Sequence, residues 1–126
     1  MKRHERASGG RDPRAYLTDI GGAIRLVKLA VEGATFDRYQ ADPILRSAVE
    51  RQFITIGEAL SQLLRLEPDL ANGISNARLI IAFRNILVHG YADIAHDIVW
   101  SALETDMLVL EGEVDQLLRI MSDDPI

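Results

Sequence analysis

Two Asp-Pro pairs constrain the fold of this chain more than any other feature. Asp12-Pro13 and Asp42-Pro43 each precede a long segment in which apolar residues recur every three or four positions. Aspartate is a favoured helix cap and proline fits the first turn of a helix, so each pair predicts where a helix begins. The apolar spacing predicts that each helix buries one face. We therefore expect two long amphipathic helices, over residues 12–33 and 42–66.

The same spacing predicts a third and a fourth helix. The third starts at Ser75 or Asn76 and ends at Gly90, since glycine is typical of helix C-termini. The fourth starts near Asp93, and its apolar residues alternate three and four positions apart without a break, as in a bundle helix. Those residues are Trp100, Leu103, Met107, Leu110, Val114, Leu117 and Met121.

The segments between these helices are short. We expect a connector over residues 35–41 and a loop over residues 69–75, because Pro68 cannot continue the helix before it. No stretch of useful length alternates as a strand does. The predicted fold is all-α: an antiparallel up-and-down four-helix bundle with short extra helical pieces.

The length of 126 residues suits one domain with its own core. We expect a flexible basic tail over residues 1–11, a single helical domain over residues 12–121 and a frayed end over residues 122–126. The absence of cysteine excludes disulfides and thiolate metal sites. No apolar run reaches the roughly 20 residues of a membrane span, and the first ten residues lack the apolar core of a signal peptide. These features predict a cytoplasmic protein.

Reactive side chains gather at the end of the third helix. Asn85 and His89 are four positions apart and share one helix face, and the long Arg84 side chain can reach back toward it. His89 can exchange a proton near neutral pH, whereas Arg84 stays charged and can grip two phosphate oxygens. Together they predict a phosphodiester site that requires no metal ion.

The spacing Arg84-x4-His89-x-Tyr91, with Asn85 directly after the arginine, resembles the motif of HepT-like toxins of the HEPN superfamily. The resemblance extends upstream to Ile56–Ala59, and downstream to Asp93-Ile94 and Ile98–Trp100. It covers roughly residues 12–121. The position of the motif at the end of the third of four helices makes the match more specific than the short pattern alone.

This resemblance implies a HEPN-like bundle that acts as a homodimeric, metal-independent endoribonuclease without a cofactor. Two copies of the motif would form one cleft, in which a ribose 2′-hydroxyl attacks the adjacent phosphate of RNA. His89 would move protons, Arg84 would stabilise the charge on phosphorus, and Asn85 would orient one of them. The resemblance also implies a type VII-like toxin–antitoxin system, in which a partner nucleotidyltransferase antitoxin of the MntA type inactivates the toxin by adenylylating Tyr91.

A polar stripe on the second helix can belong to the same site. It consists of Arg51, Thr55, Glu58, Gln62 and Arg65, which are spaced so that they share one face. One interpretation is a solvated face with weak ion pairs. The other is that Glu58 or Arg51 lines the catalytic cleft.

A metal site at His89, Asp93 and His96 is the weaker interpretation of those residues. Their spacings of four and three would suit one continuous helix, but Gly90 is expected to break it, and no second cluster of ligands follows. We therefore predict no metal, and His96 is expected on the surface.

The distribution of charged residues leaves a second class of function open. Residues 92–126 carry nine acids and one base, while residues 1–91 carry ten acids and thirteen bases, so the net charge of −5 arises from the C-terminal part. An acidic chain is an unusual nuclease. The alternative is a non-catalytic helical module that holds a nucleotide or RNA for a separate nucleotidyltransferase. A phosphotransfer bundle with His89 as the phosphorylated residue is a third and weaker hypothesis.

Overall fold

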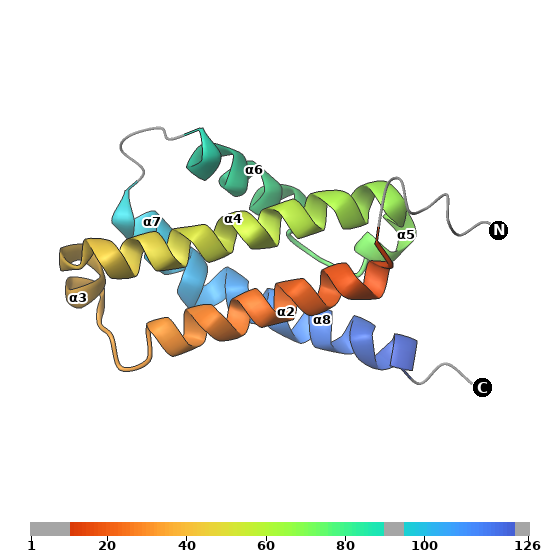
Figure 1. Cartoon of the computed structure of the whole chain (residues 1–126), viewed down its shortest axis with the longest axis horizontal. Coiled ribbons are helices and arrows are strands. Elements are labelled where there is room, and N and C mark those ends of the chain that lie inside the picture. Colours follow the sequence, from red (N-terminus) through yellow and green to blue (C-terminus); the bar gives the residue numbers. More distant parts are fainter. Residues whose placement is uncertain (1–10, 90–94, 123–126) are drawn as a thin grey trace.

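The protein is described here from a computed structural model, which covers residues 11–89 and 95–122. Four long helical segments run alternately up and down (Figure 1). They are α2 (Pro13–Ala30), α4 (Pro43–Leu66), α6 (Ala77–Val88) and a final segment made of α7 (His96–Ser101), η1 (Ala102–Asp106) and α8 (Met107–Ser122). The predicted all-α, antiparallel bundle is confirmed.

Both Asp-Pro pairs begin helices as predicted. The Asp12 carboxylate accepts a hydrogen bond from the Arg14 amide, and the Asp42 carboxylate accepts bonds from two amides of the first turn of α4. The buried face of each helix follows the three-to-four spacing. The resulting core contains Leu17, Ile20, Ile24 and Val27 of α2, Val49, Ile56, Leu60 and Leu63 of α4, and Val99, Leu103, Met107, Leu110 and Val114 of the last segment.

Two segments predicted as connector and loop contain short helices, so those predictions were wrong in part. Residues 36–41 form α3 (Phe36–Ala41), which is capped by Thr35 and buries Tyr39 against the Trp100 ring at 5.3 Å between centroids. Pro68 ends α4 but also opens α5 (Pro68–Ala71), because proline suits the first position of a new helix. Both helices are too short to show periodicity, and burial of aromatic rings stabilises α3 instead.

The last segment is not the unbroken α-helix that the apolar seam predicts. Its residues 102–106 form a π-helical turn, η1, in which the Met107 amide donates to the Ala102 carbonyl. The Thr105 hydroxyl donates a hydrogen bond to the Ser101 carbonyl at 2.8 Å. This bond competes with the backbone hydrogen bond that the same carbonyl accepts in a regular α-helix. The seam residues still face the core on both sides of this turn. The predicted start near Asp93 lies outside the described residues.

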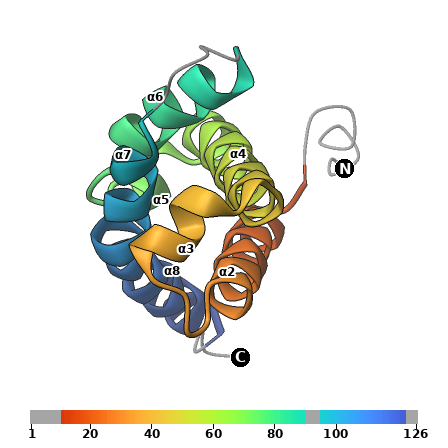
Figure 2. The same ribbon diagram turned by 90° about the vertical axis from the view of Figure 1, so that its left-hand side faces the viewer.

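The third helix, α6, stands at the edge of the bundle. It packs mainly on α4, and the end-on view shows it beyond α4 and across the molecule from α8 (Figure 2). Three apolar residues of this helix remain exposed: Leu79, Ile86 and Val88. Within residues 11–89 and 95–122, no helix is both long and apolar enough to cross a bilayer.

Candidate functional site

The predicted reactive residues lie on the second half of α6 and at its end. Arg84 and Asn85 belong to the helix, and His89 caps its C-terminus, donating its backbone N–H to the Asn85 carbonyl at 3.1 Å. The side chains of Asn85 and His89 are exposed, whereas Arg84 is half-buried. The site is therefore reachable from solvent.

Arg84 is held by two neighbours. Its Nη1 donates to Asn85 Oδ1 at 2.6 Å, and its Nη2 donates to Glu58 Oε2 of α4 at 3.3 Å. The Arg84 side chain is 27% exposed and the Glu58 side chain 57% exposed, so water screens this ion pair and its stabilisation is small. The guanidinium is thus aimed by its neighbours yet remains available to a stronger anion, such as a phosphate.

The stem of Arg84 crosses α4 directly above Gly57. A Cβ added at Gly57 would lie 2.3 Å from Arg84 Cβ and 2.6 Å from its Cγ, distances that packed atoms do not adopt. Glycine is therefore required for α6 to approach α4 this closely. In the sequence, Gly57 stands out only as part of the family resemblance at Ile56–Ala59, and its packing role was not predicted. The role could have been suspected because Gly57 lies in the middle of a long predicted helix. Glycine destabilises a helix interior, so its presence there indicates a close packing contact.

Of the two residues proposed to line the cleft, the structure brings only one to the arginine. Glu58 contacts Arg84, as described above. Arg51 lies two turns earlier on the exposed face of α4 and does not line the crevice at Arg84. Of the polar stripe, Thr55, Glu58 and Gln62 line the same crevice as Arg84, whereas Arg51 and Arg65 do not.

A polar crevice opens beside Arg84, between α2 and α4. Its volume is about 350 Å³, and its walls carry two ion pairs. One pair is Arg84–Glu58, and the other joins Arg11 to Asp19 at 2.5 Å, with the Arg11 guanidinium 5.0 Å from the centroid of the Tyr16 ring. Arg11 was predicted to belong to the N-terminal tail, and no pattern in the sequence indicated that it lines this crevice.

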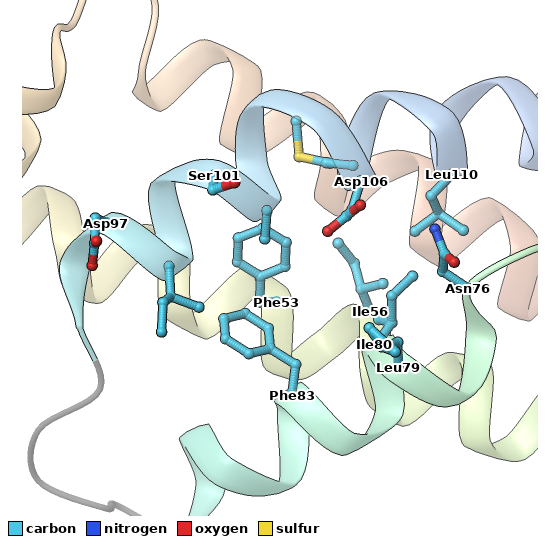
Figure 3. A pocket seen from close by; sticks show the side chains of 13 residues that line it. Phe53, Ile56, Asn76, Leu79, Ile80, Phe83, Asp97, Ser101, Asp106 and Leu110 are labelled. Carbon is cyan, nitrogen blue, oxygen red and sulfur yellow. The ribbon is translucent and has the colours of Figure 1, made fainter.

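A second hollow lies on the other side of α6 and is mainly apolar. It has a volume of about 440 Å³ between α6 and the last segment, with the rings of Phe53 and Phe83 packed edge to face at its floor (Figure 3). The carboxylates of Asp97 and Asp106 lie on its wall (Figure 3). Because carboxylates repel phosphate, this hollow is a poor place for a nucleic acid backbone.

The motif continues into residues that the structure does not describe. Gly90, Tyr91 and Asp93 lie outside the described residues, so neither the position of Tyr91 nor the less favoured metal set of His89, Asp93 and His96 is defined. The other two tyrosines of the chain, Tyr16 and Tyr39, are buried in the core. Within the described ranges, no group of three or more His, Cys, Asp or Glu residues could hold a metal ion.

Comparison with known proteins gives one family. The family model described as ribonuclease HepT-like matches residues 20–117, which contain the whole motif. A protein of Caldanaerobacter subterraneus subsp. tengcongensis, named as a candidate RNase, is 27% identical over 107 residues, covering 85% of this chain and 95% of its own length. A Thermococcus cleftensis protein named probable ribonuclease HepT is 27% identical over 113 residues, covering 86% of this chain and 98% of its own. No solved structure matches significantly.

The contact at Gly57 predicts that Gly57→Ala destabilises the fold. An alanine inside an exposed helix is ordinarily worth about 1 kcal/mol over glycine, but here the methyl group would collide with the Arg84 stem. We expect a lower free energy of unfolding in urea. Gly112→Ala is the matched control, since an added Cβ there meets no atom within 4 Å, and we expect it to raise stability. An equal gain for both variants would contradict the close contact.

Proposed function

We propose, from the premise that the chain belongs to the ribonuclease HepT-like family and is an endoribonuclease, that it cuts RNA without a metal ion through Arg84 and His89. The observation that supports this most is the Arg84 guanidinium, held by Asn85 and Glu58 at the edge of a polar crevice. His89 follows five positions later, at the exposed end of the same helix.

The chemistry is a transesterification. His89, as the neutral imidazole, takes the proton of a ribose 2′-hydroxyl, whose oxygen then attacks the adjacent phosphorus. The bond from phosphorus to the 5′-oxygen of the next nucleotide breaks, and that oxygen receives a proton from a general acid. Arg84 stabilises the extra negative charge on the phosphorane, and Asn85 keeps its guanidinium oriented.

The reaction favours two copies of the site. One His89 can act as base or as acid, but not as both in a single step, so a second imidazole from a twin subunit completes the pair. Leu79 and Ile86 are exposed, seven positions apart on one face of α6, and Leu79 also lines the apolar hollow beside that helix. We therefore assign the face formed by Leu79 and Ile86 to a two-fold dimer interface.

His89→Ala should abolish the cutting of RNA. With EDTA present, we expect the wild-type protein to cleave cellular RNA and the variant to be slower by about 100-fold or more, as for the loss of a general acid–base. Equal rates for the two proteins would remove His89 from the mechanism. A wild-type protein that binds RNA without cleaving it, and that is harmless when overproduced, would favour the non-catalytic binding module that the acidic net charge suggests.

Leu79→Glu should separate the dimer and lower the activity. Leu79 of α6 and Leu29 of α2 are both 68% exposed, so Leu29→Glu is a control of equal exposure on a different face. We expect light scattering after gel filtration to give a dimer mass for wild type and Leu29→Glu, and a monomer mass for Leu79→Glu. A dimer in all three proteins would place the interface elsewhere.

Tyr91 is the proposed site of control by a nucleotidyltransferase antitoxin. Tyr16 and Tyr39 are buried, which supports Tyr91 as the modified tyrosine. An adenylyl group there adds a phosphate near Arg84 in sequence, and this phosphate competes with RNA for the guanidinium. Such a pairing would make the chain the toxin of a type VII-like system.

Incubation with an MntA-type nucleotidyltransferase and ATP should add about 329 Da for each adenylyl group and stop RNA cleavage. Tyr91→Phe should stay unmodified and remain active in the same mixture. A mass increase in Tyr91→Phe would assign the modification to another residue.

A further inference from the structure

The polar crevice continues the path of an RNA strand beyond Arg84. Helices α4 and α6 are antiparallel (Figure 1), and Arg84 crosses α4 at Gly57. His89 therefore lies toward the N-terminal end of α4, while the crevice residues Glu58 and Gln62 lie toward its C-terminal end. An RNA whose phosphate is bound at Arg84 and whose ribose faces His89 would enter the crevice with its neighbouring nucleotide.

The lining of the crevice suits an uncharged group that forms hydrogen bonds. The two guanidinium groups of Arg11 and Arg84 are balanced by the carboxylates of Asp19 and Glu58, so the walls carry no net charge. Between these pairs the crevice presents the polar side chains of Thr55, Ser61 and Gln62. A nucleobase with its ribose is such a group, and its size is compatible with a volume of about 350 Å³.

Two of these side chains are oriented by their own helix. The Gln62 amide oxygen accepts a hydrogen bond from the Arg65 guanidinium, which leaves the amide NH2 to donate. The Thr55 hydroxyl donates to the Arg51 carbonyl at 3.2 Å, which leaves its oxygen to accept. The donor on Gln62 and the acceptor on Thr55 are about two helical turns apart, so they can contact the base and the ribose of one nucleoside.

We propose that this crevice is a nucleoside-binding subsite for the RNA nucleotide that flanks the cleaved phosphate, with Gln62 as the residue that reads its base and Thr55 as a contact to its ribose. The proposal rests on the proposed function, because Arg84 is taken as the phosphate-binding group. It also gives the polar stripe of α4 a role other than solvation.

The test uses RNA that binds but cannot be cut. A short oligonucleotide with 2′-O-methyl groups at every position lacks the attacking hydroxyl, so its binding is independent of catalysis. We expect Gln62→Leu to weaken its binding by roughly three- to tenfold, the effect of one lost hydrogen bond. Gln116→Leu is the matched control, since Gln116 of α8 accepts a hydrogen bond from Arg119 three positions later, as Gln62 does from Arg65. We expect its binding to equal that of wild type.

The same oligonucleotide should shift the NMR signal of the Gln62 side-chain amide and leave that of Gln116 in place. Gln62→Leu should also alter the base preference of cleavage on a mixed-sequence RNA. Unchanged binding by Gln62→Leu together with an unshifted Gln62 amide would overturn the subsite, even if RNA is cut through His89. Weakened binding in a protein that cuts no RNA would refute the proposed nuclease and retain the crevice as an RNA-binding site.

Discussion

The close approach of α6 to α4 at Gly57 is the contact on which the candidate site depends. A side chain at residue 57 would overlap the first two carbons of the Arg84 stem, so the spacing of the two helices and the position of the arginine are set by the same missing Cβ. Glu58, the next residue on α4, then meets the guanidinium. Gly57 and Glu58, which are adjacent on α4, thus set how closely the Arg84 stem packs on that helix and where its guanidinium points. This coupling places the site on rigid helices instead of on a loop.

The distribution of charge is compatible with the anion-binding site proposed for this acidic chain. Its excess of acids lies in residues 92–126, and within that range α8 lies across the bundle from α6 (Figure 2). At ordinary salt, charges more than about 10 Å apart at the surface are largely screened from each other. The field at Arg84 is therefore set by its neighbours Glu58, Asp19 and Arg11 rather than by the net charge of −5. The net charge of −5 is therefore no argument against the RNA partner proposed for this surface.

The sequence predicted what depends on periodicity and on capping, and missed what depends on individual side-chain contacts. The long helices and the Asp42 cap follow from local chemistry, as did the bundle. The helix α3 is stabilised by rings of Trp100 and Tyr39, which are about sixty positions apart, so no local pattern could predict it. The π-helical turn coincides with one side-chain contact, the hydrogen bond from the Thr105 hydroxyl to the Ser101 carbonyl. Arg11 at the crevice wall was likewise hidden, because its partners are Asp19 and Tyr16.

The Glu58–Arg84 ion pair has opposite effects on a phosphate-binding site. A carboxylate beside a guanidinium orients it in advance, which lowers the entropy cost of binding a phosphate. It also occupies one of the donors that the phosphate would use, and its negative charge repels the ligand. Because Glu58 is mostly exposed, it can swing into water at little cost when an anion arrives. In the proposed mechanism, the pair would keep the arginine oriented between turnovers and give way when RNA binds. A buried carboxylate in the same place would hold the guanidinium too strongly, since breaking a buried pair costs about 3–5 kcal/mol.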